Sequence, residues 1–264
     1  MTDDGRSNQT ALVTGASYGI GRELAWCCAR GGFDLVLVAR SGDKLRSLAA
    51  EIAGRHPVKA RVLEADLSDP EAPGRIEREL ASEGVGIAAL VNNAGFGVNG
   101  PFTSQAVELQ RELLQVNVVA LTHLTRLLLP GMLARRRGHI LNVASTAAFQ
   151  PGPLMAVYYA SKAYVLSLSE ALSEELRGTG VTVTALCPGP TASGFQARAA
   201  MQHSRLFVRP AMDALKVAET GYAAMMAGKA IAIPGLLNRL LAQSVRISPR
   251  FLVRRIAGWL NATA

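Results

Sequence analysis

The segment Thr14-Gly-Ala-Ser-Tyr-Gly-Ile-Gly21 decides the fold, because it joins a short apolar run to an amphipathic stretch. The run at 11–13 predicts a strand, and the stretch from about 20 to 30 predicts a helix that the glycine pair at 31–32 ends. Glycines at such a junction permit a tight turn and the close approach of a pyrophosphate. The helix start offers free N–H groups and a positive dipole end to the phosphates. The segment therefore predicts a dinucleotide-binding loop, with an ordinary glycine-rich turn as the alternative.

Short apolar runs and longer amphipathic stretches alternate along the rest of the chain. The runs have few charges and little alternation, as expected for strands covered on both faces, and they fall at 34–39, 60–63, 87–91, 139–143, 181–186 and 230–233. Helices are expected over about 42–54, 70–82, 104–130 and 157–178. This order predicts an α/β fold with a Rossmann-type, doubly wound parallel sheet of about seven strands.

The length and composition suit one domain over residues 1–264. Hydrophobic residues make up 49% of the 264, which is enough for a large core. Cys27, Cys28 and Cys187 are expected to be core residues in a reducing compartment, without disulfides or a metal site. The polar N-terminus predicts no secretory signal, and a charge-free apolar run of about 18 residues is missing, so no membrane-spanning helix is expected. These features favour a cytoplasmic protein.

Positive charge gathers near the C-terminus. The formal net charge is +8, and six basic residues follow Glu219 while no acidic residue does. Such a segment can meet anionic lipid, a phosphorylated ligand or another subunit, and its few aromatic residues argue against nucleic acid. Apolar residues between the arginines predict two amphipathic helices over about 235–264, broken at Pro249. Packing on the body or on a partner is the ordinary explanation, and peripheral contact with an anionic membrane is the alternative.

The end of the second predicted strand indicates which dinucleotide binds. In this fold an acidic residue about 20 residues past the glycines accepts a hydrogen bond from the ribose 2′-hydroxyl of NAD. Here Ala39 leaves that place empty, and Arg40 offers a guanidinium fork that suits a 2′-phosphate. We therefore expect NADP(H) in preference to NAD(H), unless Arg40 is only a solvated helix-entry residue. Asp66, followed by Leu67, is placed either to approach the adenine ring or to cap the next helix.

Tyr158 and Lys162 are the first candidates for chemistry. They lie four residues apart on one predicted helix, so their side chains share a face. A phenol has an ordinary pKa of about 10, and a nearby ammonium lowers that pKa. A phenol tuned in this way can donate a proton to a carbonyl oxygen or take one from an alcohol. An isolated pair with this spacing is also typical of a helix surface.

Ser145 and Asn117 are two further polar candidates. Ser145 follows the fifth strand, at the sheet edge where ligands bind, and its hydroxyl could hold a substrate oxygen beside Tyr158. A turn-forming serine is the alternative, with Thr146 as a rival donor. Asn117 interrupts a helix rich in Leu and Val and therefore needs polar partners. It could hold a water that links Lys162 to solvent, or make a structural hydrogen bond to a neighbouring helix.

Over about residues 10–192 the chain resembles the short-chain dehydrogenase/reductase family. The matching motifs, in chain order, are Thr14-Gly15-x-x-x-Gly19-x-Gly21, Asn92-Asn93-Ala94-Gly95, Asn117, Ser145, Tyr158-x-x-x-Lys162 and Pro188-Gly189. The interval of 13 residues between Ser145 and Tyr158 matches the family's spacing and selects Tyr158 over Tyr159. The resemblance implies the reduction of a carbonyl or the oxidation of an alcohol with NAD(P).

The resemblance also assigns roles. Tyr158 would be the general acid and base, Lys162 would lower its pKa and bind the nicotinamide ribose, Ser145 would orient the substrate, and Asn117 would hold a relay water. Asn92 and Gly95 would help to shape the cofactor wall. The expected cofactor contacts are Gly15, Ser17, Tyr18, Gly19, Ile20, Gly21, Arg40, Asp66, Leu67, Asn93, Ala94, Gly95, Tyr158, Lys162, Pro188, Gly189 and Thr191. Arg40 resembles the NADP-preferring branch, although Tyr18 stands where that branch often has a basic residue.

The expected activity is an NADP(H)-dependent interconversion of a carbonyl and an alcohol. Apolar residues favour an apolar or acyl substrate, such as a 3-ketoacyl or steroid-like compound, under a lid at about 190–210; they are Phe96, Phe149, Leu154, Met155, Phe195, Met201 and Phe207. The family resemblance implies a homodimer or homotetramer built on the helices at 104–130 and 157–178. A non-catalytic NADP(H) sensor or scaffold and an NAD-dependent alcohol dehydrogenase are the alternatives.

Overall fold

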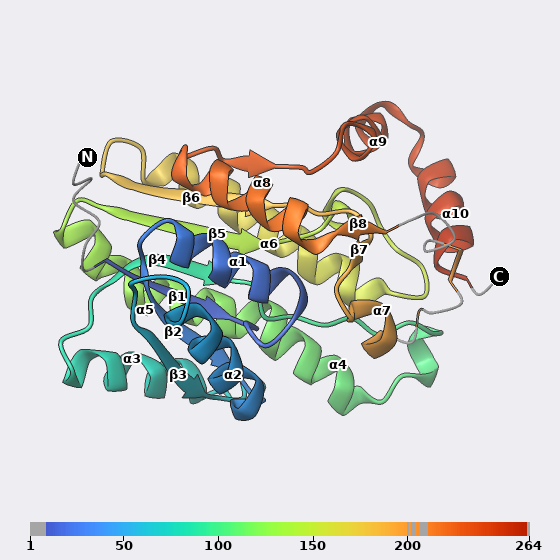
Figure 1. Cartoon of the computed structure of the whole chain (residues 1–264). Coiled ribbons are helices and arrows are strands. Elements are labelled where there is room, and N and C mark those ends of the chain that lie inside the picture. Colours follow the sequence, from blue (N-terminus) through green and yellow to red (C-terminus); the bar gives the residue numbers. More distant parts are fainter. Residues whose placement is uncertain (1–8, 200, 202–203, 206–210, 263–264) are drawn as a thin grey trace.

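The computed structural model describes residues 9–199, 201, 204–205 and 211–262. Its main sheet has seven parallel strands in the order β3-β2-β1-β4-β5-β6-β9 (Figure 1). The strands are β1 Thr10–Thr14, β2 Asp34–Ala39, β3 Ala60–Glu64, β4 Ile87–Asn92, β5 Gly138–Val143, β6 Val181–Leu186 and β9 Ile231–Ala232. The strand order reverses between β1 and β4, which is the topology of doubly wound dinucleotide-binding folds. The predicted fold class is confirmed.

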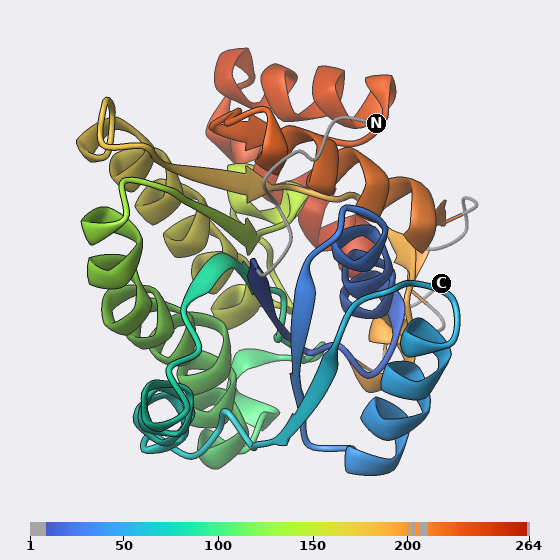
Figure 2. The same ribbon diagram turned by 60° about the vertical axis from the view of Figure 1, so that its left-hand side comes forward.

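Helices cover both faces of this sheet (Figure 2). One layer contains α1 (Gly19–Arg30), α2 (Gly42–Ala53) and α8 (Ala214–Met226), and the other contains α3 (Ala72–Ser82), α5 (Leu121–Ala134) and α6 (Ala156–Glu175). Neighbouring strand residues supply the two layers alternately. Val13 packs in the core with Leu24 of α1, whereas Leu12 packs in the opposite core with Leu124 of α5. Both faces of the strands are therefore buried, as their apolar sequences predict.

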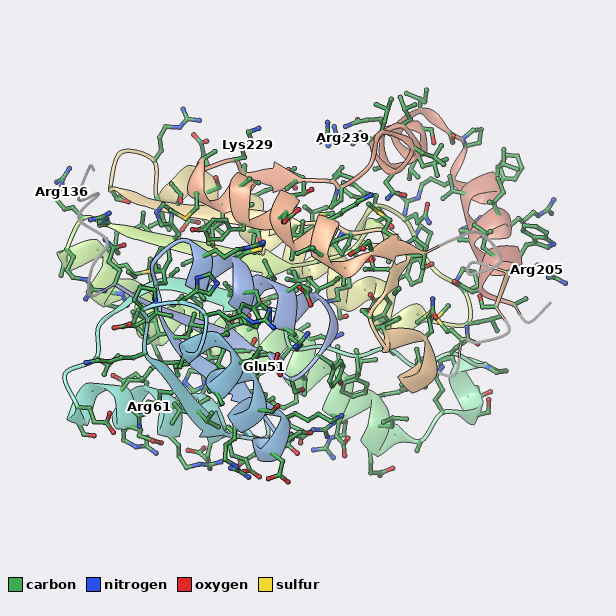
Figure 3. All side chains as sticks on the ribbon, in the orientation of Figure 1. Glu51, Arg61, Arg136, Arg205, Lys229 and Arg239 are labelled. Carbon is green, nitrogen blue, oxygen red and sulfur yellow. The ribbon has the colours of Figure 1, made fainter. Side chains whose placement is uncertain are left out.

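Two ion pairs join the edge strand β3 to the helix that covers it. Arg61 of β3 pairs with Glu79 of α3 and with Glu83 just beyond it (Figure 3). These charged groups are partly exposed, so the ion pairs contribute little to the free energy of folding. Their main effect is to orient β3 relative to α3. The buried apolar residues carry most of the stabilisation.

The helix predicted at 104–130 is wrong in detail. The structure has α4 (Val107–Leu114), a π-helical segment (Gln115–Ala120) and α5 in a continuous helix. By length and composition alone this continuous helix could span a membrane, contrary to the expectation from the sequence. One face of it is buried in the fold, through Leu113, Leu124 and Met132, while Leu114 and Val119 are exposed.

The sequence reading missed helix α8. Its sequence is rich in Ala and Met and contains Gly221, so it has little amphipathic periodicity. Gly221 is needed because an added Cβ would lie 2.6 Å from the side chain of Leu186 on β6. One face of this helix packs closely on the sheet, and only Lys216 and Glu219 mark its exposed face with charge, so the sequence pattern is weak.

The C-terminal prediction is confirmed by two helices, α9 (Leu236–Ile247) and α10 (Arg250–Asn261), which Pro249 separates. The expected lid contains the short strand β7 (Thr191–Ala192) and helix α7 (Phe195–Arg198), and β7 pairs with β8 (Met212–Asp213). The predicted lid residue Phe207 lies outside the described residues. The three cysteines are buried and free of disulfides.

We expect Leu90→Ala to lower the free energy of unfolding by about 2–5 kcal/mol, because it would leave a cavity in the centre of the sheet. Leu90 is fully buried on β4, between β1 and β5. Leu236→Ala is the control, since 72% of Leu236 is exposed and its truncation should change stability by less than about 0.5 kcal/mol. Urea unfolding followed by circular dichroism measures both, and equal effects would contradict this assignment of the core.

Candidate active site

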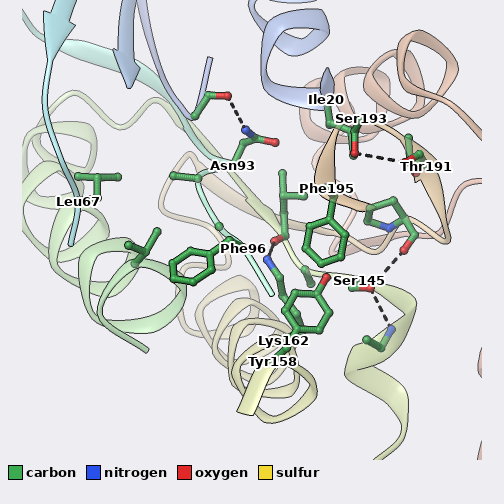
Figure 4. Close-up of a pocket in the computed structure, with 18 of the residues that line it drawn as sticks. Ile20, Leu67, Asn93, Phe96, Ser145, Tyr158, Lys162, Thr191, Ser193 and Phe195 are labelled. Atoms are coloured by element: carbon green, nitrogen blue, oxygen red, sulfur yellow. Dashed lines mark hydrogen bonds between the residues drawn. The ribbon is translucent and has the colours of Figure 1, made fainter. Parts of the chain in front are cut away.

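A cavity of about 460 Å³ opens at the carboxyl ends of the strands (Figure 4). Its walls come from the segments that follow β1 to β6, although these segments are far apart in the sequence. Ligands of doubly wound sheets bind at this edge, where the strand order reverses. The cavity extends from Arg40 and Asp66 at one end to Ser145, Tyr158 and Lys162 at the other.

The glycine turn brings backbone unusually close to backbone. Gly15 and Gly19 have positive φ values of 65° and 58°, which only glycine adopts without strain. A Cβ on Gly15 would lie 2.7 Å from Nδ2 of Asn93, and one on Gly21 would overlap both that atom and the Gly15 carbonyl. Gly19 and Gly21 do not line the cavity, but their missing side chains allow the turn that does.

Thr14 and Asn93 hold this turn against the next strand along the sheet. The Thr14 hydroxyl donates to the Val91 carbonyl and accepts from the backbone N–H groups of Asn93 and Ala94, at 3.0 Å each. The Asn93 amide donates to the carbonyls of Thr14 and Gly15. The sequence reading gave Thr14 no role, although a buried threonine before a glycine turn needs partners of this kind. Asn93 supports the loop and also lines the cavity.

Helix α1 begins beside the cavity with its N–H groups available to an anion. It has no acidic residue in its first turn and no side-chain cap. Such a helix start favours a phosphate through its N–H groups and dipole. Ser17, Tyr18 and Ile20 line the cavity here, as expected. The ammonium of Lys44 lies 5.7 Å from the centre of the Tyr18 ring, so a basic residue from α2 stands near the position that lacks one in the loop.

Arg40 and Asp66 form the far end of the cavity. A guanidinium nitrogen of Arg40 lies 3.9 Å from a carboxylate oxygen of Asp66, and both side chains are largely exposed. Asp66 accepts a hydrogen bond from the backbone N–H of Ser68. The alternative that Asp66 caps the next helix is wrong, because α3 begins only at Ala72, after Glu71.

Ser145, Tyr158 and Lys162 meet at the near end of the cavity (Figure 4). Tyr158 and Lys162 lie one turn apart on α6, and the Lys162 ammonium lies 5.8 Å from the centre of the Tyr158 ring. That ammonium donates a 2.8 Å hydrogen bond to the Val143 carbonyl at the end of β5. Ser145 accepts from the backbone N–H of Ala147, so it forms a turn as well as facing the cavity. The turn-forming interpretation of this serine is confirmed, and its role toward a substrate stays a prediction.

Burial governs the protonation of the two helix residues. Burial raises the pKa of Tyr158 well above its ordinary value, and the neighbouring Ser145 hydroxyl opposes the shift. The Lys162 ammonium, which donates to the Val143 carbonyl, does not offset this rise, so the expected lowering of the Tyr158 pKa is not produced by the protein's own groups. Burial also lowers the pKa of Lys162 to about 8.

Asn117 makes hydrogen bonds to the loop at Phe96 and to α6. Its amide exchanges two hydrogen bonds with the backbone of Phe96 and donates a third to Ser161 of α6. It does not line the cavity, but an added Cβ on Gly95 would lie 3.0 Å from its Oδ1 and 3.4 Å from the Lys162 ammonium. The π-helical segment buries Asn117 and turns its side chain toward this loop. Of the two interpretations of Asn117, the structure bears out the hydrogen bond to a neighbouring helix.

Most of the remaining expected contacts line the cavity. They are Leu67, Ala94, Gly95, Pro188, Gly189 and Thr191, and the sequence reading missed Ser193, which stands beside Gly19. The expectation for Asn92 is wrong, because its amide is buried on β4 and donates to Thr125 and Asn142. A polar residue on a buried strand forms such a network and does not reach the ligand edge.

The expected substrate wall is confirmed in part. Phe96, Met155, Phe195 and Met201 line the cavity beside Tyr158, and the Phe195 ring lies 5.2 Å from the Tyr158 ring. Phe149 and Leu154 do not line it. Phe149 instead packs in a separate apolar cluster with Leu121 and Val165.

The fold and the site together define a dinucleotide-binding protein with a polar reaction centre. A family model described as short chain dehydrogenase matches residues 9–203. The chain therefore belongs to the short-chain dehydrogenase family. The family resemblance noted in the motifs is confirmed.

Curated relatives share the larger part of the chain. It is 39% identical over 181 residues to a very-long-chain 3-oxoacyl-CoA reductase of Mycosarcoma maydis, which covers 67% of this chain and 51% of that protein. It is 36% identical over 182 residues to the Bos taurus protein of the same name, covering 67% and 58%. The chain thus spans about half the length of the curated relatives that it matches.

Solved structures match almost the whole fold. A short-chain dehydrogenase from Sphingobium yanoikuyae in complex with NADPH is 33% identical, with a TM-score of 0.81 over 90% of this chain and 93% of that one. A short-chain dehydrogenase/reductase from Burkholderia phymatum in complex with NAD is 25% identical, with a TM-score of 0.79 over 92% and 94%. With the side-chain-free glycine turn and the open helix start, these matches support an NAD(P) cofactor.

Because Lys162 is buried, we expect the free energy of unfolding to depend on pH through this residue. The unfolded chain keeps this lysine charged up to its ordinary pKa of 10.5, whereas the folded chain releases the proton near pH 8. Between these values the unfolded state binds more protons, so stability due to this group rises with pH. We expect the wild type to gain as much as roughly 3 kcal/mol relative to Lys162→Met between pH 7 and pH 10.5. Urea unfolding over this pH range measures the difference.

Lys229→Met is the control, because Lys229 is exposed and should give the same pH slope as the wild type. If Lys162→Met followed the wild type over the whole pH range, the ammonium would not be desolvated in the folded protein.

Proposed function

We propose that the chain is an NADP(H)-dependent oxidoreductase that interconverts a ketone or aldehyde and an alcohol by hydride transfer. One observation carries the proposal: a phenol, a hydroxyl and an ammonium meet at one end of a cavity whose other end is a glycine turn and a guanidinium. Glycine turns of this kind bind pyrophosphate. The opposite end then receives the reactive part of the dinucleotide and the substrate.

The proposed chemistry divides between the cofactor and the side chains. When bound, the nicotinamide supplies the hydride to the carbonyl carbon, or accepts it from the alcohol carbon. Tyr158 gives its phenolic proton to the carbonyl oxygen in reduction, or takes the hydroxyl proton in oxidation. Ser145 donates a hydrogen bond to the same oxygen as negative charge develops on it. Burial leaves the phenol protonated at neutral pH, and positive charge beside it would have to lower its pKa for efficient proton transfer.

Lys162 and Asn117 would support this reaction without exchanging a proton with the substrate. Lys162 reaches the cavity wall with its ammonium, where it would bind the nicotinamide ribose and add positive charge near the phenol. Asn117 fixes the Phe96 backbone, and thereby the wall at Gly95, opposite Lys162. We propose that it positions these groups and is the place where a relay water is held.

An apolar or acyl substrate fits the same cavity best. Phe96, Met155, Phe195 and Met201 form an apolar wall next to Tyr158. The names of the curated relatives support a 3-ketoacyl compound within this class. The arginine at the adenosine end, with no acidic residue on the strand end at Ala39, supports NADP(H).

We further propose a homodimer or homotetramer through α4, α5 and α6. Apolar surface is exposed by Leu114 of α4, by Val119 of the π-helical segment between α4 and α5, and by Tyr164 of α6.

Tyr158→Phe should lower NADPH-dependent turnover of an apolar ketone by about 10²–10⁴-fold, because the phenolic proton is lost while the ring remains. The affinity for NADPH should change little. Tyr159→Phe is the matched control, since the Tyr159 hydroxyl donates to Asn261 and not into the reaction centre. NADPH absorbance and calorimetric titration measure the two effects. Tight NADPH binding without turnover of any carbonyl in the wild type would favour a sensor over an enzyme.

Arg40→Ala should weaken NADPH binding by about 10- to 100-fold, since hydrogen bonds to a charged phosphate contribute about 1.5–3 kcal/mol. NADH lacks that phosphate, so its dissociation constant should stay within about twofold. Arg46→Ala is the control, because Arg46 is an exposed arginine that does not line the cavity. Calorimetric titration with both cofactors separates the cases, and an equal loss for NADPH and NADH would refute the preference.

A further inference from the structure

Helices α9 and α10 expose many large apolar side chains, which together are called their outer face below. Of the fifteen large apolar side chains that are exposed in the described part of the chain, nine lie on these two helices. They are Leu236, Leu237, Leu240, Leu241 and Ile247 on α9, and Phe251, Leu252, Ile256 and Trp259 on α10. Exposed apolar surface concentrated in this way marks a contact with another molecule or with a membrane.

The inner faces of the same helices are firmly attached to the fold. Asn261 at the end of α10 is fully buried, where it accepts from the Tyr159 hydroxyl and donates to the Pro153 carbonyl. Asn238 of α9 donates to the Pro234 carbonyl and lies so close to Gly189 that a Cβ there would approach it to 2.6 Å. The apolar face is therefore held outward, and no rotation of the helices can bury it without breaking these contacts.

The charged side chains that α9 and α10 carry have one sign. Arg239, Arg246, Arg250, Arg254 and Arg255 are all exposed, and no acidic residue occurs after Glu219. Among the described residues these five arginines form no ion pair with a carboxylate. Figure 3 labels Arg239, which lies beside α9. Arg255 also stacks over the Phe251 ring, at 6.0 Å from its centre.

This combination favours one kind of partner. A second copy of the chain would bring five more arginines against these five, and the like charges would repel. Leucine, phenylalanine and tryptophan flanked by arginine are typical of helices that lie in the interface of an anionic bilayer. We propose that the outer face of α9 and α10 docks on an anionic lipid surface, with the apolar side chains entering the headgroup region and the arginines binding lipid phosphates.

Docking would place the cavity next to the bilayer. Asn238 touches Gly189 and Asn261 touches Tyr159, and both of these partners line the cavity. An apolar substrate could then pass from the lipid to the site without crossing bulk water. This consequence rests on the proposed function, whereas the docking itself does not.

Co-sedimentation with vesicles tests the docking on the whole chain. The protein should bind mixed vesicles of phosphatidylcholine and phosphatidylglycerol at low salt. Binding should be much weaker to vesicles of pure phosphatidylcholine, and much weaker to the mixed vesicles at high salt. Each arginine near an anionic surface contributes about fivefold to partitioning, so Arg250→Gln/Arg254→Gln should lose roughly 30-fold. The control Arg78→Gln/Arg137→Gln removes two exposed arginines elsewhere and should bind as the wild type does.

Tryptophan fluorescence tests the insertion. The chain has two tryptophans, so Trp26→Phe leaves Trp259 as the only reporter. Its emission should shift to shorter wavelength on vesicles containing phosphatidylglycerol, because 59% of Trp259 is exposed in the free protein. Reduction of a water-soluble ketone without vesicles should be unchanged in the arginine variants, which separates failure of docking from failure of the enzyme.

Three results would overturn the docking. The first is that the wild type does not bind anionic vesicles. The second is that Arg250→Gln/Arg254→Gln and the control variant lose vesicle affinity equally, and the third is that the Trp259 emission does not shift. A fall in molecular mass on Leu240→Ser/Leu241→Ser, measured by light scattering without lipid, would instead identify the face as an interface between copies.

Discussion

The contact between the glycine turn and the Asn93 amide is the constraint on which the site depends. Gly15 and Gly21 lie against this amide so closely that neither can carry a Cβ. Another residue cannot easily replace Asn93, because its amide donates to two carbonyls of the turn. Thr14 ties the same strand end to Val91. These bonds hold the ends of β1 and β4 together, and a cleft can form beside them only because the strand order reverses there.

The sequence predicts the parts of this arrangement that local patterns specify. Buried strands appear as apolar runs and the turn appears as spaced glycines, so the sheet and one wall of the cavity are predictable. The serine, tyrosine and lysine are predictable because strand ends and helix faces bring them together. What the sequence does not show is the tertiary environment. The π-helical turn that buries Asn117, the close packing of Gly221 in α8 against Leu186, and the burial that keeps the Tyr158 pKa high all arise from contacts with distant segments.

Burial affects the two reactive side chains of α6 in the same chemical sense. It disfavours phenolate at Tyr158 and ammonium at Lys162, so both groups are pushed toward their neutral forms. The fold offsets this in part, through the Ser145 hydroxyl beside Tyr158 and through the Val143 carbonyl that accepts from Lys162. A site with this electrostatic character gains most from a ligand that brings opposing charge or polar groups. The reaction centre is therefore incomplete as a catalyst until the rest of the cavity is filled.

The adjacent tyrosines Tyr158 and Tyr159 show how the fold separates chemistry from anchoring. Consecutive helix residues point about 100° apart, so one hydroxyl faces the reaction centre while the other reaches Asn261 of α10. Helix α10 is therefore attached at the residue next to the proposed general acid, and α9 lies against Gly189, which also lines the cavity. A force on the outer face of the tail would act on both walls at once. The tail is for this reason best regarded as part of the cavity's structure, although it lies beyond the family motifs and its outer face is directed elsewhere.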